Sequence, residues 1–417
     1  MLCRRPSGSR SGACPSGRVK TQSLLIALVI CTLLGAAQPV PPATFASDLA
    51  FLKQHTNVIV LGDASGAQLV VAPEYQGRVM TSTTGAPGAP GFGWIGRTAI
   101  ASGVRQPHMN VFGGEDRFWL GPEGGQYALY FKPGDPFDLD HWQTPEPFDW
   151  GAWNVASRSA TAATFNTAMD VVNHSGTKFS LSVIRTVRLL RATDIAKELQ
   201  VTVPANVRTV AFESANDVTN TGTRPWDPAS GLISIWILGQ FAPSPSTTIV
   251  IPFVQGLESS LGPIVNDAYF GKVPPERLQI KDGVIRFRGD GLYRSKIGLS
   301  PQRATSIAGS YDAAAHVLTI VQFTKPAGVR DYVNSMWEMQ KEPYRGDVLN
   351  SYNDGPLAPG KPGLGPFYEL ESSSPALRLG VGERFTHVHR TFHFQGPEVA
   401  LDPIARAVLK IGVTDLR

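Results

Sequence analysis

Glutamates and histidines gather near the C-terminal end of the chain. Glu369 and Glu371 stand two residues apart in one β-type segment, and His387, His389 and His393 follow in the next. Because side chains alternate across a strand, each set is expected to share one face. If the two strands are neighbours, contrasting surroundings can separate the pKa values of an acid and a base. The alternative interpretation is a solvated sheet face.

The same segment offers a second chemistry. His387-x-His389 on one strand face could bring two imidazole nitrogens to a transition metal, as in metal-dependent His-x-His β-barrel enzymes. The glutamate that such enzymes place downstream is replaced here by His393, so this interpretation is the less favoured one. No metal or other cofactor is expected, although Glu369 and Glu371 could instead hold a calcium ion.

A second polar motif lies between the paired glycines of residues 113–125. Its charged and aromatic residues include Glu115, Arg117 and Trp119. In an extended chain Glu115 and Arg117 point to one side, and glycines on both sides permit sharp turns that bring them to a pocket. Bidentate charged groups beside an indole suit a sugar, which has hydroxyls to bind and an apolar C–H face. A surface turn held by an arginine–carboxylate pair is the alternative.

A third polar region, residues 337–355, mixes amides, carboxylates and aromatic rings. Asn353 and Asp354 stand at its end, directly after Tyr352. Carbohydrate clefts use this mixture, but ordinary turns have it too.

The elements that must position these residues are mainly strands. Short β-type segments such as 57–61, 68–71 and 247–251 alternate with Gly, Pro, Asn and Asp, which indicates an all-β fold. Residues 178–190 show a period of two, with Arg185 on the apolar face. Either a bulge near Ile184 turns Arg185 outward, or this arginine points inward and lines a site. Short helices are expected at 44–55 and at 403–411, the latter capped by Asp402 and Pro403.

The amino-acid composition excludes several classes of function. The 417 residues include 38 Lys and Arg, 34 Asp and Glu, and three cysteines that all precede residue 37. That segment has five basic residues and no acid, which leaves 33 basic against 34 acidic residues beyond it. A nearly neutral chain without a basic cluster is a poor nucleic-acid partner. Thiol catalysis is excluded after residue 37, and no Gly-x-Ser-x-Gly elbow, phosphate loop or Cys/His zinc pattern occurs.

The N-terminus has the pattern of a secretory signal peptide. Basic residues end at Lys20, an uncharged run covers 23–34, and small residues follow at 35–37. We expect cleavage near Ala37, a periplasmic or secreted mature protein, and no membrane association after cleavage. Residues 38–417 are expected to form one domain with a core at about 48–397.

Several motifs together resemble a known group. Residues 71–80 (VAPEYQGRVM), the GGEDRFW stretch from Gly113, the Asn220-Thr221-Gly222 turn and the Glu-x-Glu strand followed by Gly382-Glu383 are similar to the galactose mutarotase-like superfamily. The chain resembles a poorly characterised, secreted bacterial branch of that group. The resemblance covers about residues 48–397 and implies a large antiparallel β-supersandwich with few short peripheral helices and a sugar cleft on its concave face.

In aldose 1-epimerases of this fold, a C-terminal glutamate is the general base and a histidine protonates the ring oxygen. The resemblance assigns the base to Glu371, with Glu369 in reserve, and the sugar-binding arginine to Arg78 or Arg117. The epimerase segment with the acidic histidine is replaced here by residues 234–239 (SIWILG). His387 or His389 could supply the proton instead, from a different geometry.

These observations favour a secreted carbohydrate-active enzyme of the epimerase, lyase or glycosidase type. A non-catalytic carbohydrate-binding module is the main alternative. The sugar and the oligomeric state are left open. The expected catalytic residues are Glu371, His387 and His389. The expected substrate-binding residues are Arg78, Glu115, Arg117, Trp119, Glu369, Asn353 and Asp354.

Overall fold

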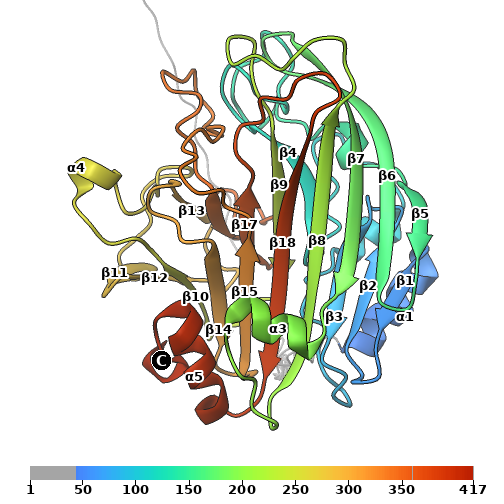
Figure 1. Cartoon of the computed structure of the whole chain (residues 1–417), viewed down its shortest axis with the longest axis vertical. Helices are drawn as coiled ribbons and strands as arrows, with labels where there is room; N and C mark the ends of the chain where they lie inside the picture. Colours follow the sequence, from blue (N-terminus) through green and yellow to red (C-terminus); the bar gives the residue numbers. More distant parts are fainter. Residues whose placement is uncertain (1–43, 359, 417) are drawn as a thin grey trace, which may run out of the picture. The chain divides into compact units, whose positions relative to one another are not determined.

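The computed structural model describes residues 44–358 and 360–416, and antiparallel strands dominate this part of the chain (Figure 1). The strands form a ten-stranded, a five-stranded and a three-stranded sheet. The predicted all-β, antiparallel sandwich class is therefore confirmed. The expected signal peptide, residues 1–37, lies outside the described residues.

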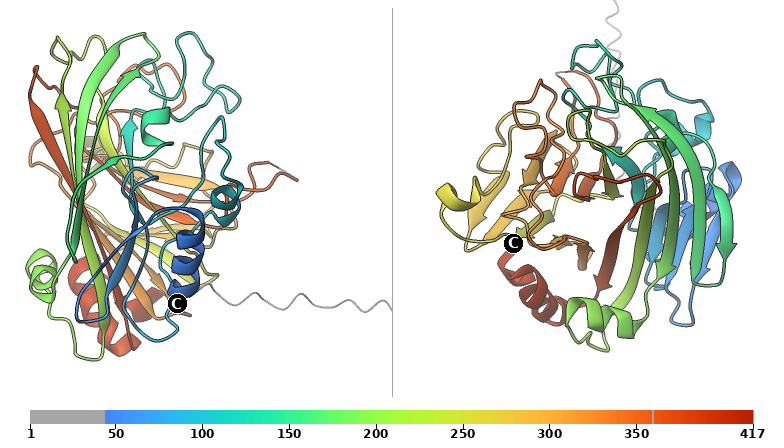
Figure 2. Two further views of the ribbon diagram at one scale, coloured as in Figure 1. Left: turned by 90° about the vertical axis from the view of Figure 1, so that its right-hand side faces the viewer. Right: turned by 45° about the horizontal axis from the view of Figure 1, so that its top comes forward.

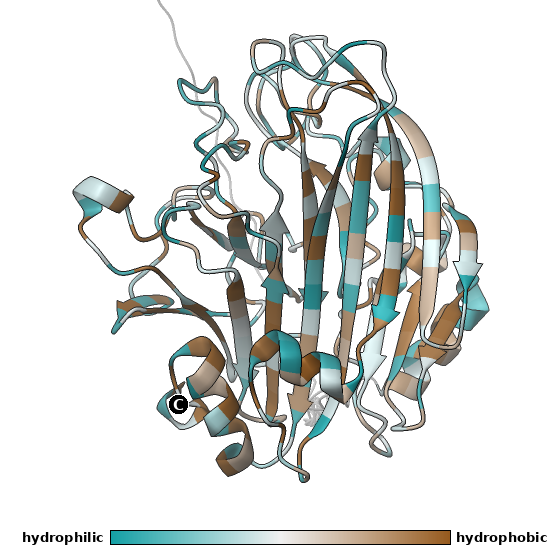
Figure 3. Cartoon of the chain, viewed as in Figure 1, coloured by the Kyte–Doolittle hydropathy of each residue, from teal (hydrophilic) through white to brown (hydrophobic). Residues whose placement is uncertain are grey.

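The ten-stranded sheet has the order β11-β12-β10-β14-β15-β18-β8-β7-β6-β5. Its strands are β5 (Asn154–Arg158), β6 (Ala162–Val172), β7 (Lys178–Leu189), β8 (Arg208–Asn220), β10 (Thr247–Pro252), β11 (Leu278–Lys281), β12 (Val284–Arg288), β14 (Ile307–Asp312), β15 (Val317–Phe323) and β18 (Arg384–Gln395). Hydropathy alternates along β7 and β8, as expected when one face covers a core (Figure 3). The histidine-bearing strand β18 thus lies inside the sheet, between β15 and β8.

The five-stranded sheet has the order β13-β16-β17-β9-β4, so that the glutamate-bearing strand β17 is central. Its strands are β4 (Arg117–Gly121), β9 (Ser234–Phe241), β13 (Ser295–Leu299), β16 (Leu349–Asn353) and β17 (Tyr368–Ser373). The three-stranded sheet consists of β1 (Ile59–Gly62), β2 (Gln68–Ala72) and β3 (Arg78–Thr83).

The hydrophobic core lies between the two larger sheets. Phe118 and Ile237 of the five-stranded sheet share one buried cluster with Phe212 of the ten-stranded sheet. Leu370 of β17 joins a second buried cluster with Ile285 of β12. Since side chains alternate along a strand, the residues between these core positions point to the other face of the five-stranded sheet.

Short helices decorate the sheets. Helix α1 (Phe45–His55) confirms the helix expected near the N-terminus, with Thr44 as its N-cap accepting a 3.2 Å hydrogen bond from the Ser47 amide. The remaining short helical segments are α2 (Arg97–Ser102), α4 (Glu258–Leu261), η1 (Glu146–Phe148) and η2 (Val413–Leu416).

The C-terminal helix differs from the expectation. Helix α5 spans Glu398–Leu409, with Pro397 as its N-cap and Pro403 inside it. The expected start at Pro403 is therefore wrong. Ala400 and Leu401 are buried against the sheet, and this packing favours an earlier first turn than the Asp-Pro pair suggests.

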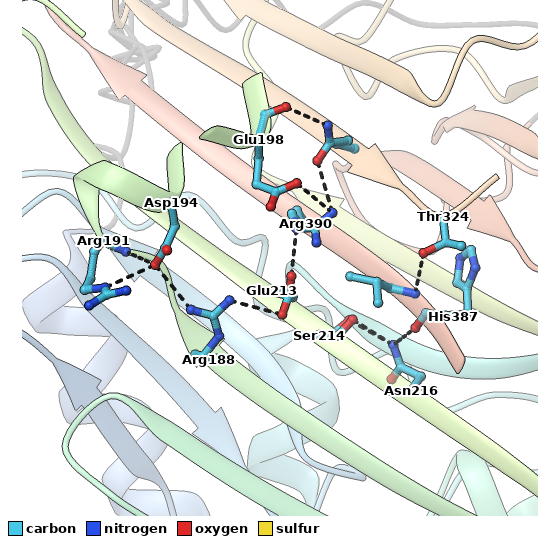
Figure 4. Close-up of polar contacts among 12 residues, drawn as sticks. Arg188, Arg191, Asp194, Glu198, Glu213, Ser214, Asn216, Thr324, His387 and Arg390 are labelled. Carbon is cyan, nitrogen blue, oxygen red and sulfur yellow. Dashed lines mark hydrogen bonds and ion pairs between the residues drawn. The ribbon is translucent and has the colours of Figure 1, made fainter. Parts of the chain in front are cut away.

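Helices α3 (Ala192–Leu199) and α5 cover the outer face of the ten-stranded sheet (Figures 1 and 2). Ion pairs hold α3 there (Figure 4). Arg188 of β7 lies 3.3 Å from both Asp194 and Glu213, and Arg390 of β18 lies 2.7 Å from Glu213 and 3.4 Å from Glu198. This outer face is thus a structural surface of apolar packing and charge pairs.

Arg185 of β7 points inward. The pairings of β7 with β6 and β8 continue through this position without a register shift, so the expected bulge near Ile184 is absent from this described strand. Arg185 is fully buried, whereas Ile184 is exposed. Its guanidinium contacts Asp116 at 2.5 Å and Asn216 at 2.6 Å, which makes it part of an interior polar network.

The described residues, 44–358 and 360–416, belong to one compact unit. Among the helices of residues 44–358 and 360–416, none is long and apolar enough to cross a membrane.

Candidate functional site

A cleft lies over the five-stranded sheet, with an empty volume of about 640 Å³ that includes the solvent at its mouth. Each of the five strands contributes a side chain to it. Four of these form one row across the sheet. Lys296 of β13 pairs with Tyr352 of β16, which pairs with Glu369 of β17 and then Gln240 of β9. Arg117 of β4 belongs to the adjacent row. The cleft floor is therefore the sheet face that points away from the ten-stranded sheet.

Glu371 lies in the adjacent row, two residues from Glu369 on the same face of β17. It is fully buried. The Lys296 ammonium and the Trp236 indole donate to its Oε2 over 3.1 and 3.0 Å. Its Oε1 has no hydrogen-bond partner among the described residues. One cationic and one neutral donor stabilise the negative charge of this carboxylate, while one acceptor oxygen stays unused.

Glu369 has different surroundings. Its Oε1 accepts hydrogen bonds from Arg117 at 3.0 Å and from Gln240 at 2.8 Å. Burial raises the pKa of Glu369 to about 7, against the attraction of Arg117 and with added repulsion from Glu371. Near neutral pH this carboxyl group can therefore carry a proton.

Lys296 is the electrostatic centre of the cleft. Burial alone would lower its pKa, but the negative charges of Glu371, Glu123 and Glu369 raise the pKa above its ordinary value. Lys296 is therefore a permanently charged donor at neutral pH. Its Nζ also lies 4.8 Å from the ring centroid of Trp236.

Aromatic rings form the walls. Arg117 stacks on Trp119 at 4.0 Å, and Trp119 meets Trp236 edge to face at a centroid distance of 5.6 Å. Trp142 and Trp337 stack at 6.1 Å. These rings give the cleft broad apolar faces beside its charged floor.

Two further charged side chains line the cleft, Glu123 and Arg294. Glu123 is half-buried, and burial raises its pKa. Arg294 lies over the Phe270 ring, with its guanidinium carbon 3.8 Å from the ring centroid.

The model of a protein family of unknown function, DUF6786, matches residues 43–417. The chain belongs to this family. None of the curated proteins matches it. Solved structures with a similar fold include a protein of Escherichia coli K12 provisionally described as an aldose 1-epimerase, at 13% identity and a TM-score of 0.49, covering 82% of this chain and 99% of that one.

A galactose mutarotase-like protein from Lactobacillus casei ATCC 334 is similar at 11% identity and a TM-score of 0.46, covering 81% of this chain and 100% of that one. The similarity to galactose mutarotase-like proteins that the sequence predicts thus recurs among solved structures. It is a similarity of fold at low identity.

In this DUF6786 chain four predicted site residues come together. Glu369 and Glu371 share a face, as expected, and Arg117 contacts Glu369 directly. Trp119 is linked to Glu371 through Trp236, whose ring packs against Trp119 and whose Nε1 donates to the carboxylate. The C-terminal glutamates and the motif near residue 117 therefore belong to one site.

The two predicted catalytic histidines do not reach this site. His387 and His389 hydrogen-bond the Ser372 hydroxyl at 2.9 and 2.8 Å. Ser372 follows Glu371 directly and so points to the opposite face of β17. Asn216 donates to the His387 carbonyl on the same interior side (Figure 4). The expectation that these imidazoles meet Glu371 is wrong, because β18 belongs to the other sheet.

Burial makes both imidazoles weak bases. It lowers the pKa of His387 to about 3, with repulsion from His389, and that of His389 to about 4. Both are therefore neutral at neutral pH. Within the described residues no group of three or more His, Cys, Asp or Glu side chains is arranged to hold a metal ion.

Glu115 also lies outside the cleft. Its Oε2 accepts hydrogen bonds from Ser82 and His393, each at 2.9 Å, in the fully buried space between sheets. The chain bends at Glu115 after Gly113 and Gly114, whose φ values are 85° and 106°. This bend breaks the alternation that would have placed Glu115 beside Arg117.

Arg78, Asn353 and Asp354 support the site from behind. Arg78 is buried and donates to the Gly113 carbonyl at 3.0 Å, where it holds the turn that leads into β4. Asn353 binds the backbone of the loop before β13. Asp354 accepts a 2.8 Å hydrogen bond from the cleft residue Tyr352. None of the three lines the described cleft.

Sequence reasoning missed Lys296, Arg294, Gln240 and Trp236. The only local signal was the alternation of Arg294 and Lys296 at the start of a β-type segment without other charges. These four residues reach the cleft because the strand order β13-β16-β17-β9 brings their segments together, and the segments lie up to 135 residues apart in the sequence.

Proposed function

We propose that the cleft binds a carbohydrate and that Glu371 and Glu369 exchange protons with the sugar. The observation that carries this proposal is the pair of carboxylates on one strand face, in contrasting surroundings, beneath an aromatic wall. Enzymes obtain a base and an acid from two carboxyl groups by such a contrast.

The binding step follows from the shape and chemistry of the walls. Trp119, Trp142 and Trp337 can cover the C–H face of a sugar ring, while Arg117 and Gln240 offer donors to its hydroxyls. A sugar ring held between the tryptophans and these polar side chains comes to lie over β17.

The proton transfers use the two glutamates in opposite directions. Glu371 is held by Lys296 and buried next to the cleft residues Lys296 and Trp236, and it removes a proton from the sugar through its Oε1, which has no partner among the described residues. Glu369, with its raised pKa, supplies a proton to a ring or leaving oxygen. Positions two apart on a strand are about 6.6 Å apart along it, which leaves room for the reacting atoms. The same pair would serve epimerase, lyase or glycosidase chemistry.

The test is turnover of a panel of mono- and oligosaccharides, followed by NMR, with wild type and Glu371→Gln. We expect turnover to fall at least about a hundredfold, the size of a positioned proton transfer, with sugar binding and melting temperature preserved. Glu258→Gln, at an exposed glutamate of α4, is the matched control and should react like wild type. Unchanged turnover in Glu371→Gln would exclude this glutamate as the base.

A binding module is the second candidate function. Both glutamates are paired with cations, at 3.0 Å for Arg117–Glu369 and 3.1 Å for Lys296–Glu371, and such pairs can serve binding alone. Calorimetric binding of a sugar without any product after long incubation would select this candidate.

We also propose export. Residues 1–37 combine basic residues, an uncharged run and small residues before the expected cleavage point. A mature protein that starts near Gln38 in a periplasmic or secreted fraction, by mass spectrometry, is the expected result. An intact chain in the cytosol would contradict it.

A further inference from the structure

Arg294 is a cation of the cleft without an acidic partner. In the described part of the chain it forms no ion pair, and its Nε has no hydrogen-bond partner. Its guanidinium carbon lies over the Phe270 ring, 3.8 Å from the ring centroid, and the guanidinium interacts with the Tyr352 hydroxyl. The side chain is thus positioned, half-buried and charged, while its ability to bind an anion is unused.

The other two cations of the cleft are already engaged. Arg117 pairs with Glu369, and Lys296 pairs with Glu371. The third carboxylate, Glu123, interacts more strongly with Lys296 than with Arg294. Arg294 is therefore the cation of the cleft that no carboxylate contacts among the described residues.

We propose that the cleft takes a monoanionic sugar, whose carboxylate or sulfate ester group is bound by Arg294. This inference rests on the proposed function and names its substrate class. A guanidinium presents parallel N–H groups that bind two oxygens of one oxyanion, and the cation–π contact with Phe270 restrains the position of this fork.

The lower charge of a monoanion favours it over a phosphate ester. Glu123 and Glu369 line the cleft and Glu371 lies next to it, so these carboxylates equal Arg117, Lys296 and Arg294 in number. A phosphate ester, with a charge of about −1.5 to −2 at pH 7, would meet more repulsion from them than a carboxylate or a sulfate ester. A neutral sugar would leave the half-buried guanidinium without an anion.

The experiment is calorimetry on wild type with five probes, which are methyl glucuronide, methyl galacturonide, glucose 6-sulfate, glucose 6-phosphate and methyl glucoside. We expect at least one monoanionic probe to bind about tenfold or more tightly than methyl glucoside, as for a charge-assisted bidentate contact. The better of carboxylate and sulfate identifies the group. Tightest binding of the phosphate or of the neutral glycoside would overturn the inference.

Variants test the residue. Arg294→Gln should lose the preference for the monoanion, so that the monoanion and the neutral glycoside bind within about twofold of each other. Arg294→Lys should retain part of the preference. Arg208→Gln removes an exposed arginine outside the cleft and should keep the preference. A preference that survives in a folded Arg294→Gln protein would contradict the assignment.

The two proposals fail differently. If neutral sugars bind and react equally well, the substrate class is wrong while the function of the cleft stands. If no sugar of any charge binds or reacts, both are wrong.

Discussion

The two faces of β17 both carry buried polar side chains, but these side chains serve different ends. On the cleft face, Glu369 and Glu371 meet cations, and Glu369 lines the cleft while Glu371 is buried next to it. On the inner face, Ser372 joins two neutral imidazoles, from His387 and His389, between the sheets. Strand alternation separates adjacent residues into a site that a ligand can reach and a polar core that it cannot.

One ion pair on the inner side has many polar partners. Asp116 and Arg185 are both fully buried, and they contact each other at 2.5 Å. Ser214 and Asn216 bind them further. The cleft, by contrast, leaves the Glu371 Oε1 and the Arg294 Nε without partners among the described residues. Polar atoms without partners occur between the sheets as well, at Glu115 Oε1, His387 Nδ1 and His389 Nε2. Those of the cleft differ because they lie beside space that a ligand can enter, whereas the Asp116–Arg185 pair contributes to stability.

The largest expected effect comes from breaking the inner ion pair. Asp116→Ala leaves the Arg185 charge buried without a counter-charge, and we expect a loss of about 3–5 kcal/mol in the free energy of unfolding, measured by denaturant titration. The matched control is Asp170→Ala, which removes an exposed partner of Lys178 and should cost no more than about 1 kcal/mol. Equal losses in the two variants would contradict the inner role.

The next prediction compares substitutions of two adjacent residues of β17, Ser372 and Glu371. Ser372→Ala removes the hydroxyl shared by His387 and His389, and the unpaired imidazoles should lower the free energy of unfolding by about 1–3 kcal/mol. Turnover should stay within about twofold, unlike the loss expected in Glu371→Gln, which spares stability. Measuring turnover and the free energy of unfolding on both variants tests the difference between the two faces of β17. A large loss of turnover in a folded Ser372→Ala protein would show that the two faces are coupled.

Local pattern predicted much of the fold. Alternation placed Glu369 and Glu371 on one face correctly, and the helix expected at 44–55 agrees with α1 to within one residue. Both signals act over a few residues, so the sequence alone contains them. The inward direction of Arg185 was left open, because its partner Asp116 lies 69 residues away.

The composition of the site was harder to predict. His387 and His389 share a face as expected, but strand order decides that this face opposes Ser372 and not Glu371. Lys296 likewise reaches Glu371 only because β16 lies between their strands. Pairing between distant strands depends on turns and core packing across the whole chain, and no local motif encodes it.

The last effect appears only in acid, and it is small within each pH unit. An unfolded histidine has a pKa of about 6.5, while burial lowers that of His389 to about 4, despite Asp116 and with added repulsion from Arg185. Between these values the unfolded chain binds more protons, so this contribution is complete above about pH 6.5 and is lost as the pH falls towards 4.

His389→Gln should therefore reduce the slope of unfolding free energy against pH in this window by up to about 1.4 kcal/mol per pH unit. Denaturant titrations between pH 4 and 6.5 measure the slope, with His55→Gln, at an exposed residue of α1, as the control for loss of an imidazole. An unchanged slope in His389→Gln would mean that the imidazole is as solvated in the folded protein as in the unfolded chain, and the inner face of β17 would then be as open as the cleft.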